Sequence, residues 1–187
     1  MALHAGADLV FELPVCFSTA TAEIFAESAV KLLLASKVVS TLSFGIEEYP
    51  EKELYYLGKL FSEEPILFKY MLGEFLKKGL SFPKAREMAV IKYLEERKIN
   101  LNVNLISKLL QKPNFILAVE YVKAVNKLGA DITIFPVIRK GNQYHDKNLT
   151  NQYASATAIR HAINSHKQNF MEKIIPHLPA STVHIIS

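Results

Sequence analysis

Cysteine and long hydrophobic runs are both scarce in this sequence. Its 187 residues include one cysteine, Cys16. One thiol cannot form a disulfide within the chain or build a cysteine zinc cluster, so a reducing cytosol is the expected compartment. The longest apolar runs, such as Val38–Phe44, are far shorter than the ~20 residues that cross a bilayer. Disulfide-stapled secreted proteins and helical membrane proteins are therefore excluded.

The N-terminus also lacks the basic stretch and apolar core of a secretory signal. The first eight residues, Met-Ala-Leu-His-Ala-Gly-Ala-Asp, are instead expected to be the end of a helix that has been cut into. Half of the residues are hydrophobic and 21% are charged, as in soluble globular proteins. We therefore expect a packed fold of a size that needs no disulfide or metal to stabilise it.

Charge of one sign is not abundant either. The formal net charge of +4 is too small to indicate nucleic-acid binding by itself. The distribution is uneven, because residues 139–167 contain a single acid, Asp146. The cations and histidines that could face phosphate there are Arg139, Lys140, Lys147, Arg160, His161, His166 and Lys167.

A strand–helix–strand pattern opens the sequence. Asp8–Leu13 is largely apolar and ends at Pro14, which cannot donate to a sheet ladder. Apolar residues then recur with a helical period over residues 20–37, and Val38–Phe44 is rich in β-branched residues. This order is typical of a βαβ unit and predicts an α/β fold with a parallel sheet.

Helices dominate the middle of the sequence. Gly79 occupies a C-cap position, and Pro83 falls in the first turn of the next helix. We predict a helical insertion at about residues 51–110 within one α/β domain over residues 1–187. Its helices are predicted at 51–62, 64–78, 83–97 and 101–110, followed by a helix at 114–127, a strand at 131–138 and helices from about 155 and at 168–177.

Two short clusters follow a predicted strand or open a predicted helix, where open α/β sheets bind ligands. Gly45 comes directly after the second strand, and without a Cβ it would let a ligand approach the backbone. The alternative is a glycine that only makes a turn. Asn114 opens a helix and could hydrogen-bond a nucleotide, although its spacing alone favours a helix N-cap.

A third cluster follows the strand at 131–138. Arg139 and Lys140 stand beside a glycine, and an arginine there can bind phosphate through two parallel hydrogen bonds. His145 precedes Asp146 directly, but adjacent side chains often point apart. We interpret this histidine as a solvated loop residue.

The fourth cluster starts a helix near residue 155. Ser155 or Thr157 can cap it, and its free N–H groups, together with Arg160 one turn later, would form an anion site. An ordinary capped helix is the alternative. The small neighbouring residues, which would let a phosphate approach closely, favour the anion site.

Six segments together resemble the bacterial tRNA(Met) cytidine acetate ligases, in the order in which that family has them. The resemblance extends from about Ala2 to Arg160 and is more specific than any one motif. The segments are Ala-Asp-Leu-Val-Phe-Glu-Leu-Pro, Ser-Phe-Gly-Ile-Glu, Gly-Leu-Ser-Phe-Pro-Lys-Ala-Arg, Lys-Pro-Asn-Phe-Ile-Leu-Ala-Val-Glu-Tyr, Tyr-His-Asp and Ala-Ser-Ala-Thr-Ala-Ile-Arg.

This resemblance implies a reaction and a fold. Such enzymes activate acetate with ATP as acetyl-adenylate, release pyrophosphate, and then acetylate N4 of the wobble cytidine of elongator tRNA(Met). Magnesium would accompany the ATP. The implied fold is the Rossmann-like one of the HxGH nucleotidyltransferases. Binding residues implied by position are Gly45, Asn114, Arg139 with Lys140, and, from the wider class, Thr157 and Arg160, although Lys140 replaces an apolar residue of the family.

The family's opening His-x-Gly-His motif does not occur in this sequence. No catalytic residue is therefore assigned, and the chain is expected to be a fragment with a missing opening segment. A noncatalytic RNA-binding or assembly module derived from the family is the alternative, and an adenylyl transferase that makes a dinucleotide cofactor is a third hypothesis. Apolar surface left by the missing segment would favour a homo-oligomer.

Overall fold

The computed structural model describes residues 2–139, 154–164 and 170–186, and their contacts group into two compact units. The larger unit is Leu13–Arg139, and the smaller one consists of the described residues outside that range. The sheet and all helices of the predicted insertion belong to the larger unit. One domain over residues 1–187 stays a prediction.

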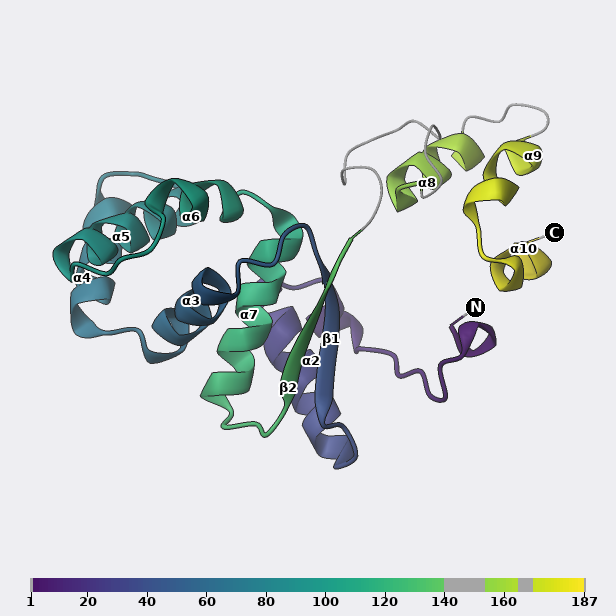
Figure 1. The fold of residues 1–187 in the computed structure, drawn as a ribbon, viewed down its shortest axis with the longest axis horizontal. Coiled ribbons are helices and arrows are strands. Elements are labelled where there is room, and N and C mark those ends of the chain that lie inside the picture. The colour runs from purple at the N-terminus through teal and green to yellow at the C-terminus, as the bar shows by residue number, and fades with distance from the viewer. Residues whose placement is uncertain (1, 140–153, 165–169, 187) are drawn as a thin grey trace. The chain divides into compact units, whose positions relative to one another are not determined.

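Two parallel strands form the sheet of the larger unit (Figure 1). Strand β1 (Thr41–Ile46) pairs along its whole length with β2 (Thr133–Ile138), and Gly45 lies opposite Val137. The predicted parallel α/β sheet is confirmed. The strand predicted at Val38–Phe44 begins and ends later in the structure. Val38 is β-branched yet 82% exposed and lies outside the ladder, and Gly45, predicted to follow the strand, lies within it.

Helices α2 (Ala22–Ser36) and α7 (Pro113–Lys127) cover one face of this sheet, on which Leu42 and Ile132 pack against the two helices. Phe44 stacks on Tyr121 of α7, with ring centroids 5.2 Å apart. Successive residues of a strand point to opposite faces. The residues of the other face are exposed or glycine: Thr41, Ser43, Gly45, Thr133, Phe135 and Val137.

The helical region between the strands has its own core. Leu54, Phe68 and Phe115 are buried there, and the last of these joins the core to α7. Gly79 has φ +80°, a left-handed conformation that glycine adopts without strain, and its N–H donates to the Leu76 carbonyl at the end of the preceding helix. The helices are α3 (Glu51–Glu63), α4 (Ile66–Lys77), α5 (Phe82–Glu96) and α6 (Val103–Leu109).

The strand predicted at Asp8–Leu13 is wrong. These residues are not in a strand, and Leu9, Val10 and Phe11 are each more than half exposed. Apolar composition and a following proline are local signals, whereas a strand also needs a hydrogen-bonded neighbour. Among the described residues, β1 pairs only with β2, and the connection between them contains α3 to α7 instead of one helix.

The remaining helices are short. The larger unit begins with α1 (Val15–Ser18), which the sequence did not predict. In the smaller unit, α8 (Ala156–Asn164) starts where a helix was predicted, and Ser155 caps it by accepting a hydrogen bond from the Ala158 N–H at 3.0 Å. No helix in the described part of the chain is long and apolar enough to cross a membrane. The C-terminal elements are α9 (Phe170–Ile174), a 3-10 turn (Ile175–His177) and α10 (Ala180–Ile186).

Candidate functional site

The carboxyl ends of the two parallel strands bring Gly45 and Arg139 together. Ile46 lies opposite Ile138, and the Arg139 N–H extends the ladder by donating to the Ile46 carbonyl at 2.9 Å. Parallel strands end at the same edge of a sheet, which is where open α/β sheets bind their ligands. Two of the residues predicted for the site are therefore neighbours, although they are far apart in sequence.

Gly45 gives the Arg139 side chain its place. A Cβ added at Gly45 would lie 3.2 Å from Cγ and 3.4 Å from Cδ of Arg139, closer than most side chains approach. The missing Cβ thus lets the arginine stem lie across the strand end. The guanidinium is on an exposed residue and forms no ion pair with any residue that the structure describes. It is available to an anion.

Asn114 lies at the start of α7, but it is not the helix cap that its spacing favoured. The N-cap is Lys112, which makes no side-chain cap hydrogen bond, and Pro113 is the first helical residue. Proline fits this position because its φ is already helical and it has no N–H to satisfy. Asn114 is therefore the second residue of the helix, and its side chain points elsewhere.

The Asn114 partner is Glu47, the residue after β1. Oε1 of Glu47 accepts a hydrogen bond from the Asn114 backbone N–H at 3.1 Å and another from its Nδ2 at 2.8 Å. A carboxylate at a helix N-terminus satisfies a free N–H group and interacts favourably with the helix dipole. The helix start is thus capped by a residue from the strand end, 67 positions earlier in the chain.

Glu47 was not among the predicted site residues. Its other oxygen, Oε2, is buried without a hydrogen-bond partner among the described residues. Buried polar atoms normally have partners, so an unpaired one indicates strain or function. The only sequence signal was its place at the end of Ser-Phe-Gly-Ile-Glu, a segment from which the glycine alone had been selected.

An ion pair lies beside this arrangement at the surface. Glu48, the next residue after Glu47, pairs with Lys112 at the N-cap of α7. The side chain of Glu48 is 51% exposed, so the pair contributes little to stability. Both carboxylates that follow β1 are therefore already engaged by the protein.

The structure does not assign the other predicted site residues to this strand-end cluster. Lys140 and the Tyr-His-Asp segment are outside the described residues. Thr157 and Arg160 are on α8, in the smaller unit, where Ser155 and not Thr157 makes the capping hydrogen bond. The structure thus brings together Gly45, Asn114 and Arg139 of the predicted set.

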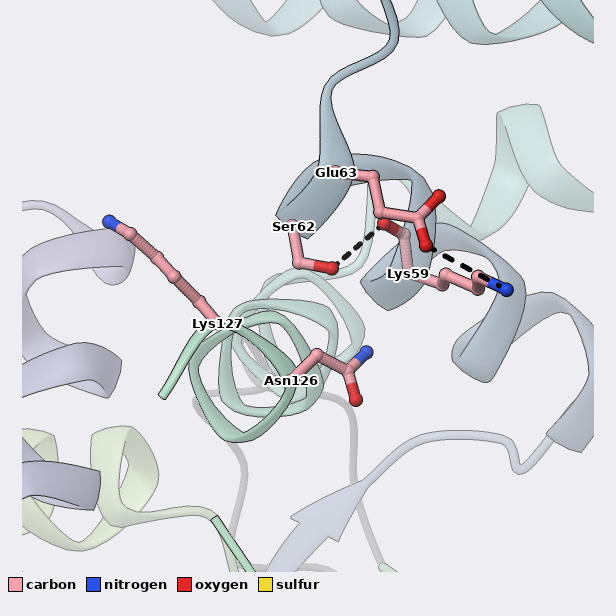
Figure 2. A pocket seen from close by; sticks show the side chains of 5 residues that line it. All are labelled: Lys59, Ser62, Glu63, Asn126 and Lys127. Atoms are coloured by element: carbon pink, nitrogen blue, oxygen red, sulfur yellow. Dashed lines mark hydrogen bonds and ion pairs between the residues drawn. The ribbon is translucent and has the colours of Figure 1, made fainter. Parts of the chain in front are cut away.

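A hollow of about 370 Å³ lies at the opposite end of α7. Figure 2 shows Lys59 paired with Glu63 and the Ser62 hydroxyl donating to the Lys59 carbonyl. Lys127 binds Glu27 at 3.0 Å, and this hydrogen bond raises the pKa of the lysine. Asn126 is twelve residues from Asn114, or about 18 Å along a helix. The hollow is therefore separate from the strand-end site, and its lining residues are Lys59, Ser62, Glu63, Asn126 and Lys127.

The strand-end cluster offers an exposed guanidinium, an amide and a glycine whose missing Cβ makes room for the Arg139 stem, at one edge of a parallel sheet. Such a set can bind a phosphate and a polar sugar or base together. Within the described residues, no group of three or more histidine, cysteine, aspartate or glutamate side chains could hold a metal ion. The exposed Arg139 guanidinium and the Asn114 amide make the strand-end site suited to an anionic organic ligand.

Curated proteins of known name resemble this chain over most of its length. A curated relative from Thermoanaerobacter sp. (strain X514), tRNA(Met) cytidine acetate ligase, is 46% identical over 176 residues, which are 94% of this chain and 42% of the relative. The enzyme of the same name from Clostridium perfringens (strain ATCC 13124) is 44% identical over 164 residues, 87% of this chain and 41% of its own length. This chain thus spans about two fifths of the length of these relatives.

Solved structures show the same fold. Crystal structures of Thermotoga maritima TmcAL match 99% of this chain with TM-scores of 0.91 for the apo form and 0.87 for the form bound to alpha-thio ATP, at 35% and 34% identity. The matched part covers 42% and 41% of those chains. The family model described as HIGH Nucleotidyl Transferase matches residues 1–187. With this match over its whole length and the Rossmann-like fold that it shares with TmcAL, the chain belongs to the HIGH nucleotidyl transferase family.

Proposed function

We propose that this chain forms part of a cytoplasmic tRNA(Met) cytidine acetate ligase, which activates acetate with ATP as acetyl-adenylate and then acetylates N4 of the wobble cytidine of elongator tRNA(Met). The observation that carries this proposal is the meeting of Gly45, Asn114 and Arg139 at the carboxyl end of the sheet. The relatives are named for this reaction, and one TmcAL structure holds an ATP analogue. These findings support ATP as the ligand of the strand-end site.

Each residue of the site has a role in this proposal. Arg139 binds a phosphate oxygen, for which its guanidinium, exposed and without an ion pair to the described residues, is suited. Asn114 hydrogen-bonds the sugar or the base, and Gly45 leaves room for the stem of the phosphate-binding Arg139. Lys140 is proposed to assist Arg139. Thr157 and Arg160 form a second phosphate-binding segment at the start of α8.

No residue of this chain is assigned to magnesium binding or to the chemical step. Mg²⁺ is proposed to bind with the triphosphate and to keep most of its waters, as it commonly does with nucleotide substrates. Glu47 and Glu48 hold Asn114 and Lys112, so no carboxylate pair after β1 is free to ligate it. The sequence contains no His-x-Gly-His, so none of its residues is assigned to adenylyl transfer.

ATP binding tests the proposal directly. In calorimetry, the chain is expected to bind ATP, and the Asn114→Ala, Arg139→Ala variant is expected to bind at least about tenfold more weakly, because two polar contacts are lost. The matched control removes the same kinds of group from the hollow at the other end of α7. Asn126→Ala with Lys59→Ala should leave ATP affinity unchanged.

Two outcomes would contradict the proposed site. Either the unmodified chain binds no ATP, or the double variant binds it as well as the unmodified chain does. An ATP-binding chain that also binds elongator tRNA(Met) would favour the ligase over a noncatalytic RNA-binding module.

A further inference from the structure

Glu47 fixes the orientation of the Asn114 side-chain amide. An amide has one donor end and one acceptor end, and a carboxylate accepts hydrogen bonds only. Oε1 of Glu47 lies 2.8 Å from Nδ2 of Asn114, so the NH₂ end must face the carboxylate. The carbonyl oxygen Oδ1 then points away from Glu47, and it accepts no hydrogen bond from the part of the chain that the structure describes.

The backbone reinforces this orientation. The same Oε1 also accepts the Asn114 N–H at 3.1 Å, so the carboxylate holds both the start of α7 and the side chain of its second residue. Because Oε1 accepts both hydrogen bonds, the Glu47 carboxylate is fixed against the helix start, and the Asn114 amide is fixed against that carboxylate. Oε2 is buried without a hydrogen-bond partner among the described residues, so the carboxylate is held here at a cost in desolvation.

We propose that Glu47 is a positioning residue which presents the Asn114 carbonyl oxygen to the nucleotide, so that the site selects a nucleoside through a hydrogen-bond donor. This inference rests on the proposed function. Adenosine carries such donors on its exocyclic amino group and on its ribose hydroxyls. A ligand that offers only acceptors would meet the oxygen of Asn114 and be disfavoured.

The orientation can be tested without any nucleotide. The side-chain NH₂ signals of Asn114 are followed by ¹⁵N NMR in the full chain, together with their hydrogen exchange. Glu47→Ala is expected to shift these signals and to speed their exchange. Glu48→Gln is the control, because it breaks the neighbouring ion pair with Lys112 and leaves both Glu47 hydrogen bonds in place. Unchanged Asn114 signals in Glu47→Ala would overturn the positioning role.

Glu47→Gln separates the hydrogen bonds from the charge. One glutamine oxygen can accept both hydrogen bonds that Oε1 now accepts. This variant should therefore keep most of the ATP affinity, whereas Glu47→Ala should lose about tenfold. Equal ATP affinity of Glu47→Ala and the unmodified chain would overturn the proposal.

The donor is identified with nucleotide analogues. ITP lacks the amino group, while 2′-deoxy-ATP and 3′-deoxy-ATP each lack one hydroxyl. One of the three analogues is expected to bind the unmodified chain about tenfold more weakly than ATP. This difference should shrink in Glu47→Ala, because the Asn114 amide can then rotate and exchange its oxygen and NH₂ ends. Equal binding of all three analogues and ATP would overturn the selection by donor. If the unmodified chain binds no ATP, the proposed function fails, while the NMR result still decides the role of Glu47.

Discussion

Replacement of Glu120 by alanine is expected to lower the free energy of unfolding by about 3–5 kcal/mol, because it leaves a buried cation without its partner. Glu120 lies on α7 and is 2% exposed. Its Oε1 accepts a hydrogen bond from Nη1 of Arg86 on α5 at 2.6 Å. The pair joins two helices whose residues are 34 positions apart in the chain.

Arg86 has little access to water that could replace Glu120. Its side chain is 15% exposed, and the guanidinium lies 4.7 Å from the Phe61 ring centroid and 5.6 Å from that of Phe82. Lys123 adds to the same cluster, since its Nζ is 3.8 Å from Oε2 of Glu120. Lys123 keeps Glu23 as a partner at 2.6 Å when the Glu120 carboxylate is removed, so the cation left without its carboxylate is Arg86.

Urea unfolding followed by circular dichroism measures this effect. Glu63→Ala is the control, because Glu63 forms an exposed ion pair with Lys59 at 3.7 Å and its loss should cost at most about 1 kcal/mol. The double variant Arg86→Met, Glu120→Leu removes both buried charges and should be more stable than Glu120→Ala. A Glu120→Ala chain within about 1 kcal/mol of the unmodified one would show that the pair is not needed.

The helices of the larger unit could be predicted from sequence because their signals are local. The helical period over residues 20–37 predicted α2, and the helices predicted at 51–62, 83–97 and 114–127 have ends within a few residues of α3, α5 and α7. Strands depend on a partner elsewhere in the chain. Asp8–Leu13 has a strand-like composition but no ladder among the described residues, and the sequence did not reveal this.

The candidate site was predictable in part for the same reason. Gly45 and Arg139 could be selected because each lies at or just beyond the end of a strand, and parallel strands end at one edge. Glu47 could not be connected with Asn114, because the hydrogen bonds between them span 67 positions. The cap predicted for Asn114 assumed a local partner, whereas the actual partner comes from the strand end.

The segments that resemble the family contain both proposed binding residues and residues that stabilise the fold, and the structure separates the two kinds. Arg86 ends one of the resembling segments, and Glu120 lies in another. In the structure the two form a largely buried ion pair between helices. Asn114 stands in the same segment as Glu120 but reaches the strand end. Segments that identify a family thus hold both binding residues and the contacts that fix the helix carrying them.

Replacement of Gly58 by alanine is expected to destabilise the chain by about 1–3 kcal/mol, although alanine is the better helix former. Gly58 is in α3, which packs closely on α7. A Cβ added there would lie 2.3 Å from Cγ1 and 2.7 Å from Cβ of Val122. Both helices would have to move apart, because Val122 is itself only 1% exposed and has no room to turn away.

Gly73 provides the matched control for this prediction. It lies inside α4, and an added Cβ would have no neighbour within 4 Å, so Gly73→Ala should stabilise the chain by about 0.5–1 kcal/mol. In a Val122→Ala background Cγ1 is absent while Cβ remains, so the cost of Gly58→Ala should fall without vanishing, with a coupling of about 1 kcal/mol. Urea unfolding of the four chains of this cycle measures it. If Gly58→Ala stabilised the chain as Gly73→Ala does, the close approach of α3 and α7 at this point would be refuted.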